Sequence, residues 1–135
     1  MTLLELNEYG ILKAHIEQCH DKIREISSRT IRSPIIDTSG ISNSPSARNP
    51  VEERYIKDMA EREKYERLIA EDTAKLERIE RYIQRIKDRR TKMIFEMHIY
   101  DNVKFWKIAM KLGGNNSESS VKQIFYRYID NHPHG

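Results

Sequence analysis

Residues 105–129 read FWKIAMKLGGNNSESSVKQIFYRYI and contain two short helical patterns separated by a turn rich in glycine and asparagine. In the first pattern apolar residues recur at helical spacing up to Leu112. Two glycines follow, and they favour a helix end because glycine readily adopts the left-handed conformation found there. Ser117 is a typical N-cap for the second helix, and Glu118 suits its first turn. The stretch therefore predicts two helices joined by a turn over residues 113–116.

The second of these helices has two unlike faces. Its apolar face is expected to pack in a core and consists of Val121, Ile124, Phe125, Tyr128 and Ile129. Its other face is polar and basic and consists of Ser119, Lys122, Gln123, Tyr126 and Arg127. Since Tyr126 and Tyr128 fall on different sides of the helix, we expect Tyr128 to be buried and Tyr126 to be available for a phosphate or a base.

A third helix is expected just upstream. Its amphipathic pattern consists of Met93, Ile94, Met97 and Ile99, and residues 100–102, Tyr-Asp-Asn, are typical of a turn. The next helix begins near Phe105. We expect Trp106 to belong to the core of this helix trio, beside Ile108 and Ala109, rather than to form a platform for base stacking.

A short helix, a glycine-containing turn and a second helix with polar and basic residues early on one face are typical of a helix-turn-helix, whose second helix enters the major groove of DNA. Lys and Arg donate to guanine, Gln pairs with adenine, and Ser bonds to a base or a phosphate. The candidate DNA-binding residues on the second helix are Ser117, Ser119, Ser120, Lys122, Gln123, Tyr126 and Arg127. Three lysines on the preceding helix are expected to neutralise phosphates without reading sequence, namely Lys104, Lys107 and Lys111.

The distribution of charge agrees with this interpretation. The 135 residues include 24 Lys plus Arg and 21 Asp plus Glu, a net charge of +3 with a pI near 9.0. Residues 1–50 hold six basic and six acidic residues, residues 51–87 hold ten and ten, and residues 88–135 hold eight and five. The basic excess therefore lies in the C-terminal third, which is where a polyanion would be expected to bind.

The N-terminal part is expected to be a helical hairpin. Residues 2–28 carry an apolar stripe with a seven-residue repeat, consisting of Tyr9, Leu12, Ile16, Cys19, Ile23 and Ile26. A second helix runs from just after Pro50 to about Arg89, and its matching stripe consists of Ile69, Leu76, Ile79, Ile83 and Ile86. Between them, residues 29–50 form a linker rich in Pro and Ser, with Ile35, Ile36 and Ile41 expected to hold it weakly to the helices.

The expected fold class is therefore all-α. An N-terminal, coiled-coil-like antiparallel helical hairpin occupies residues 1–87, and a C-terminal three-helix helix-turn-helix domain occupies residues 88–135. The hairpin has two interpretations that the sequence does not separate. It is either a stalk for the DNA-binding domain, or a surface for homodimerisation or for contact with RNA polymerase.

Other classes of function lack their motifs. No apolar run approaches the roughly 20 residues that cross a bilayer, and Glu5 and Glu8 stand where a signal peptide would be basic, so we expect a cytoplasmic protein with no membrane association. Cys19 completes an apolar stripe. His15 and His20 are close to it in sequence, but a catalytic Cys–His dyad needs an orienting carboxylate and nothing nearby suggests one, so we expect no such dyad. The C-terminal His132 and His134 lack a third ligand. We expect no enzyme activity, no metal and no cofactor.

Residues 89–129 also resemble region four of bacterial sigma factors, in which an "IA..LG" helix is followed by an "S.S.VK" recognition helix. The matching elements here are Trp106-Lys107-Ile108-Ala109, Leu112-Gly113 and Ser119-Ser120-Val121-Lys122. With the charged hairpin and its Pro/Ser-rich connector, the full length resembles phage-encoded regulators of the ArpU and RinA type. One departure is that the turn over residues 113–116 is about two residues longer than in typical sigma region four, which affects the angle of the recognition helix.

The resemblance implies a sequence-specific activator of phage late genes that binds double-stranded promoter DNA in the bacterial host cell, together with host RNA polymerase. Three alternatives remain. The C-terminal helices are a cap on the hairpin that binds nothing, or the chain is a small terminase-like DNA-packaging subunit, or it is a protein-interaction adaptor that binds a host factor.

Overall fold

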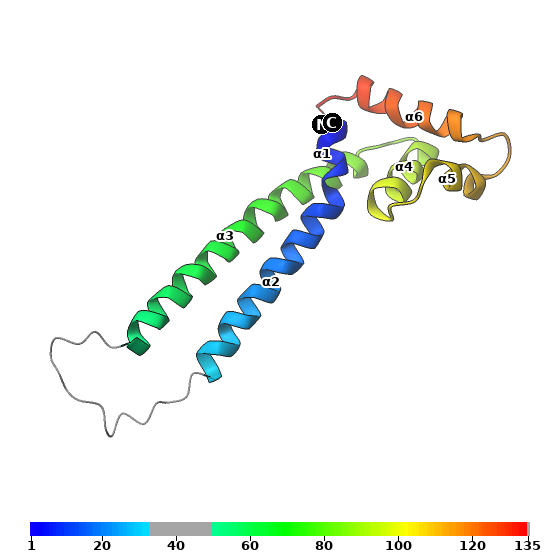
Figure 1. Cartoon of the computed structure of the whole chain (residues 1–135). Helices are drawn as coiled ribbons and strands as arrows, with labels where there is room; N and C mark the ends of the chain where they lie inside the picture. Colours follow the sequence, from blue (N-terminus) through cyan, green and yellow to red (C-terminus); the bar gives the residue numbers. More distant parts are fainter. Residues whose placement is uncertain (33–49, 135) are drawn as a thin grey trace, which may run out of the picture. The chain divides into compact units, whose positions relative to one another are not determined.

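The structure is a computed structural model that describes residues 1–32 and 50–134 (Figure 1). The described residues form helices and no strand, which confirms the all-α prediction. The elements in chain order are α1 (Leu3–Asn7), α2 (Tyr9–Arg32), α3 (Pro50–Gln84), α4 (Arg89–Phe95), the π-helical turn η1 (Glu96–Tyr100), α5 (Phe105–Leu112) and α6 (Glu118–Asn131). None of the described helices is long and apolar enough to span a bilayer.

The helix expected over residues 2–28 is divided in two at Glu8. Thr2 caps α1 through a capping box: its hydroxyl accepts a bond from the Glu5 N–H at 3.2 Å, and the Glu5 carboxylate accepts one from the Thr2 N–H at 3.1 Å. At the other end, α2 continues to Arg32, beyond the expected start of the linker at residue 29.

Three further boundaries differ from the sequence prediction. Pro50 is the first residue of α3 rather than the last of the linker, because proline at that position loses no helical hydrogen bond. Helix α3 ends at Gln84 rather than near Arg89, since Asp88 already caps α4. Tyr100 belongs to η1, and the turn that follows contains Asn102 at a φ of 55°. The linker residues Ile35, Ile36 and Ile41 lie outside the described residues.

The chain divides into two compact units: a first unit of Met1–Ala14 and Asp72–Gly135, and a second unit of His15–Glu71. The predicted domain boundary between residues 87 and 88 falls inside the first unit. The reason is a shared hydrophobic core. Buried residues of α1, α2 and the end of α3, such as Leu6, Tyr9 and Ile83, belong to the same cluster as those of α4 to α6.

Aromatic rings form the centre of the first unit. Phe95 of α4 and Phe125 of α6 are fully buried, and their ring centroids lie 4.5 Å apart. Tyr82 of α3 meets Phe95 at 6.3 Å, and Tyr9 of α2 meets Tyr100 of η1 at 4.9 Å. Such aromatic pairs contribute about 0.5–1.5 kcal/mol each beyond the area that they bury. The N-terminal residues and the end of α3 are therefore part of the fold of α4 to α6.

The second unit consists of residues 15–32 of α2 and residues 50–71 of α3. Cys19 and Ile26 are buried at the predicted stripe of α2, with Cys19 only 1% exposed. The Arg29 guanidinium lies 3.4 Å from the Asp58 carboxylate and 3.1 Å from that of Glu61, which joins the two segments. Because Arg29 and Glu61 are about half exposed, the ion pair between them stabilises the unit by no more than about 1 kcal/mol.

Candidate nucleic-acid interface

The turn between α5 and α6 has the backbone geometry that the sequence predicts. Gly113 adopts a φ of 67° and a ψ of −166°, a region open essentially only to glycine, and Gly114 has a φ of 62°. The Asn116 side chain closes the turn by donating from Nδ2 to the Gly113 carbonyl at 2.8 Å. Arg90 of α4 donates to Asn116 Oδ1 at 3.4 Å. The turn is thus held from inside and from a neighbouring helix.

Ser117 is the N-cap of α6, as predicted. Its hydroxyl accepts from the Ser120 N–H at 3.1 Å, and the Ser120 hydroxyl accepts from the Ser117 N–H at 2.9 Å, so the two residues form a capping box. The Ser120 hydroxyl also donates to the Ser117 carbonyl at 2.9 Å. Both hydroxyls are therefore occupied in holding the helix start, and their role at an interface is to fix where α6 begins.

The two faces of α6 are as the sequence predicts. Val121, Phe125 and Ile129 are buried, and Tyr128 is half buried. The outward residues are all exposed and are Ser119, Lys122, Gln123, Tyr126 and Arg127. Tyr126 remains 41% exposed although its ring centroid lies 6.1 Å from that of Phe105 on α5. A polar and basic surface with one aromatic ring is thus presented by a rigid helix.

One of these residues has a partner on its own helix. Lys122 Nζ lies 3.3 Å from the Glu118 carboxylate, with both side chains about half exposed. An exposed i,i+4 pair is worth only about 0.3–0.5 kcal/mol, so a phosphate or a guanine is able to replace Glu118 at low cost.

The three lysines of the preceding segment lie on one side of α5. Lys104 stands directly before the helix, Lys107 is in its first turn and Lys111 in its last, and all three are exposed. Spacings of three and four residues place them along one helix face. Helix α5 packs directly against α6. The lysines and the outward face of α6 therefore belong to the same packed unit.

Trp106 does not belong to the core, which corrects the sequence prediction. Its side chain is 49% exposed, and Met110, one turn later on the same face, is 72% exposed. The buried face of α5 is formed instead by Ile108 and Ala109, with Phe105 half buried beside them. Position 106 is rotated about 100° from position 105 around the helix, which carries the indole past the edge of that face.

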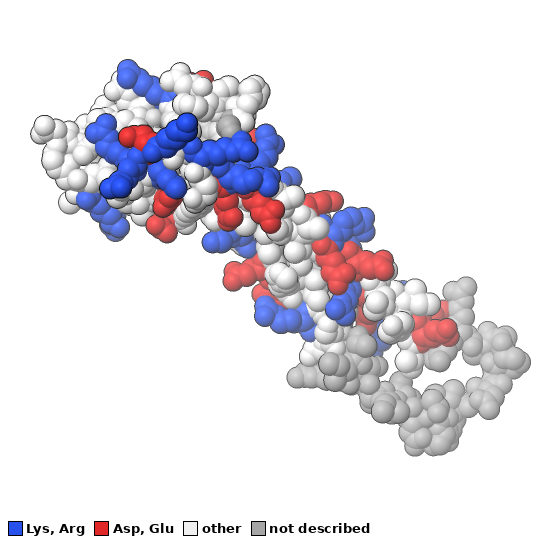
Figure 2. All heavy atoms as spheres, turned by 180° about the vertical axis from the view of Figure 1, so that it is seen from behind, with Lys and Arg blue, Asp and Glu red and all other residues white. Residues whose placement is uncertain are grey.

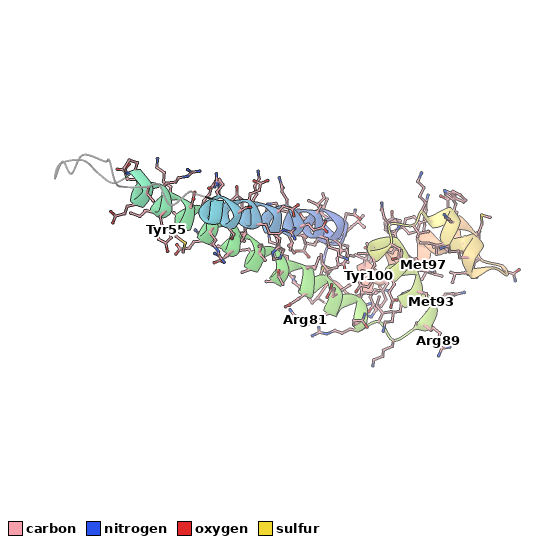
Figure 3. The ribbon with its side chains drawn as sticks, turned by 90° about the horizontal axis from the view of Figure 1, so that it is seen from below. Tyr55, Arg81, Arg89, Met93, Met97 and Tyr100 are labelled. Atoms are coloured by element: carbon pink, nitrogen blue, oxygen red, sulfur yellow. The ribbon has the colours of Figure 1, made fainter. Side chains whose placement is uncertain are left out.

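A basic segment that was not predicted from the sequence lies outside the helix-turn-helix. Residues 78–92 contain seven Lys or Arg and only two acidic residues, but the boundary drawn at residue 87 divided this run. Figure 2 shows Lys and Arg side chains gathered on one face of the first unit. In Figure 3, Arg81 comes from the last turns of α3 and Arg89 from the start of α4, on the outside of the ribbon.

The polar groups near the core serve the fold. Tyr9 donates to Glu80 Oε1 at 3.2 Å, and burial, together with the Glu80 carboxylate, raises the pKa of Tyr9 to about 12. Burial and the neighbouring Tyr128 likewise raise the pKa of Tyr82 to about 12. In the part of the chain that the structure describes, no three His, Cys, Asp or Glu side chains gather as metal ligands.

Comparison with protein-family models, with curated proteins and with solved structures found no match.

Proposed function

We propose that this chain is a sequence-specific double-stranded DNA-binding protein that regulates transcription, with α6 as the major-groove helix of a helix-turn-helix. The observation that carries the proposal is the outward face of α6. It presents two cations, an amide and a tyrosine on a capped helix, directly after a glycine turn, and it packs on a helix with three lysines. The resemblance to sigma region four adds the further proposal of a phage late-gene activator that works with host RNA polymerase in the bacterial cytoplasm.

Within this proposal the residues have two kinds of role. Arg127, Lys122 and Gln123 carry the donors and acceptors that read base edges, each well-aligned contact being worth about 1–3 kcal/mol of discrimination. Lys107 and the other lysines of α5 neutralise phosphates, which strengthens binding to all sequences alike.

The paired helices α2 and α3 are proposed to form an antiparallel hairpin that brings two copies together. A single copy engages few phosphates, and specific binding at physiological salt gains from a second copy or from polymerase. The contacts of Arg29 with Asp58 and Glu61 and the buried stripe at Cys19 and Ile26 support the hairpin. The sedimentation-derived mass of the full chain tests the oligomer: a dimer supports a regulator, and a ring supports a packaging subunit.

The test of DNA binding uses the full chain, since the core of α4 to α6 includes residues 1–14. In mobility-shift titrations with duplex DNA, Lys122→Ala/Arg127→Ala is expected to weaken binding at least about tenfold. The matched control is Arg54→Ala/Lys57→Ala, which removes the same charge from exposed positions of the second unit. Equal affinity of the two double variants, or no binding by the unaltered chain at low salt, would contradict the proposal.

A second measurement separates phosphate contacts from base contacts. Lys107→Ala is expected to weaken binding to every sequence alike and to reduce the slope of log affinity against log salt by about 1. A change in base preference would show that Lys107 reads sequence. Selection of bound fragments from phage DNA then identifies the binding site. Enrichment of a late promoter supports the regulator, and enrichment of a packaging site supports a terminase-like subunit. No enrichment supports the protein-interaction adaptor.

A further inference from the structure

A pocket on the first unit, away from the residues assigned to DNA reading, has an unusually basic lining. Its volume is about 240 Å³, and its lining residues are Met1, Arg78, Arg81, Tyr82, Arg85 and His134. Three of these six side chains are guanidinium groups, and no carboxylate is among the lining residues that the structure describes. A liquid water occupies about 30 Å³, so the pocket has room for a phosphate-sized anion with several waters.

Helical spacing explains why the three arginines meet. Arg78, Arg81 and Arg85 follow one another at intervals of three and four residues, which places them along one side of α3 and its continuation. The Arg85 N–H donates to the Arg81 carbonyl at 3.1 Å, so the helical path extends past Gln84. The adjacent stripe of the same helix, which includes Ile79 and Tyr82, is buried, and it anchors the backbone from which the arginines project.

The carboxylate that lies near Arg78 neutralises it only weakly. Arg78 lies 3.8 Å from the Glu5 carboxylate, and the two side chains are 62% and 40% exposed, so the pair is weak. Among the described residues, Arg81 forms no ion pair. Arg78 and Arg81 line one pocket as two cations that repel each other, and an anion bound beside them reduces that repulsion.

Tyr82 contributes a neutral phenol to the wall of the pocket. Tyr82 donates its hydroxyl to the His132 carbonyl at 2.9 Å, which ties the segment after α6 to α3. Because burial raises the pKa of Tyr82 to about 12, the phenol stays neutral at physiological pH. The Met1 amino group donates to the Pro133 carbonyl and so holds the same segment from the other side.

We propose that this pocket binds a phosphate group through Arg78, Arg81 and Arg85. The guanidinium is planar and offers paired N–H donors that match two phosphate oxygens, which makes arginine better suited than lysine to this recognition. The phosphate has two sources, a DNA backbone or a small phosphorylated molecule. Helix α6 is about 21 Å long at 1.5 Å per residue, and His134, three residues after its end, lines the pocket, so one turn of a duplex, about 34 Å, is long enough to follow α6 from its start to its end.

The first experiment contains no DNA and uses inorganic phosphate as the probe. The full chain is unfolded thermally in rising phosphate, against chloride at equal ionic strength. Phosphate is expected to raise the Tm of the unaltered chain, because a ligand that binds only the folded state stabilises it. Arg81→Gln/Arg85→Gln is expected to weaken the apparent phosphate affinity about tenfold or more, the loss expected on removing two charge-assisted contacts.

The matched control is Arg54→Gln/Arg67→Gln, which removes the same charge from exposed positions of α3 in the second unit. It is expected to keep the phosphate-dependent rise in Tm. No rise in the unaltered chain, or an equal loss in both double variants, would overturn the pocket proposal. Both double variants replace exposed side chains, so each is expected to fold. The Tm in chloride verifies this.

The second experiment identifies the source with duplex DNA. If the phosphate belongs to DNA, Arg81→Gln/Arg85→Gln weakens binding to all sequences, and free phosphate competes with the duplex at equal ionic strength. If the phosphate belongs to a small molecule, Arg81→Gln/Arg85→Gln binds the duplex with the same affinity as the control variant Arg54→Gln/Arg67→Gln. Either result supports the pocket once phosphate stabilisation is established. Failure of Lys122→Ala/Arg127→Ala to affect DNA binding overturns the proposed function alone, since the phosphate measurement does not depend on α6.

Discussion

At the scale of single residues, the start of α4 depends on one carboxylate. Asp88 caps the helix, accepting at Oδ2 from the Thr91 N–H at 3.0 Å and from the Thr91 hydroxyl at 2.7 Å. These two bonds hold the pKa of Asp88 below its ordinary value. The ionised carboxylate of Asp88 is therefore more stable, relative to its protonated form, in the folded chain than in the unfolded one. The cap also fixes the start of α4, whose first two residues are Arg89 and Arg90.

This lowered pKa gives a prediction for stability against pH. The contribution of the Asp88 charge is fully present above its unfolded pKa of about 3.9, and it is lost as pH falls through the lower folded value. Asp88→Asn keeps a capping side chain but has no charge to titrate. We expect the free energy of unfolding in urea to be lower for Asp88→Asn at neutral pH, and the difference from the unaltered chain to vanish in acid. Asp101→Asn, at an exposed turn position, is the control.

At the scale of elements, glycine has opposite roles at two positions. Gly10 lies within α2 and Gly113 ends α5, and a side chain added at either would meet no atom within 4 Å. Contact with neighbouring atoms therefore does not distinguish the two positions. Their backbone conformations do, since Gly113 has a φ of 67° and a ψ of −166° whereas Gly10 is helical. The turn before α6 consequently depends on glycine, and the helix does not.

We expect substitutions at these positions to change stability in opposite directions. Gly10→Ala should raise the free energy of unfolding by about 0.5–1 kcal/mol, because alanine loses less backbone freedom on entering a helix. Gly113→Ala should lower it by about 1–3 kcal/mol, because the conformation is strained for a residue with a side chain. Chemical denaturation measures both. A stabilising Gly113→Ala would mean that the turn does not adopt this conformation.

At the scale of the whole molecule, the buried apolar side chains are unevenly divided between the two units. Almost all of the buried apolar side chains among the described residues lie in the first unit, and in the second they are Cys19 and Ile26. Because burial of apolar surface is the main stabilising term in folding, the two units should differ in local stability although α2 and α3 pass through both.

Hydrogen exchange under native conditions tests this difference within a single helix. Amides in residues 54–70 of α3 are expected to exchange faster than those in residues 76–84, where Ile79, Tyr82 and Ile83 are buried. The comparison is internal, so solvent and temperature are the same for both segments. Equal protection of the two segments would show that α3 opens as one unit, and it would contradict the expected difference in local stability.

Local pattern was enough to predict much of this protein from its sequence. Helical class, the capped start of α6 and its buried and exposed faces follow from spacing and from the chemistry of serine and glycine, which act within a few residues. The break at Glu8 and the exposure of Trp106 were not predicted. The exposure of Trp106 depends on which face of α5 meets α6.

What the sequence by itself determined is the set of helices and the outward residues of α6, because hydrogen bonding and periodicity along the chain decide them. Only the tertiary structure decided that residues 1–14 and the end of α3 share a core with α4 to α6, since burial depends on contacts between distant segments. The same contacts bring Arg78, Arg81 and Arg85 to one pocket with the segment after α6. A boundary drawn by charge at residue 87 separates these arginines from His134, which lines the same pocket, because charge counted along a chain does not record its folding.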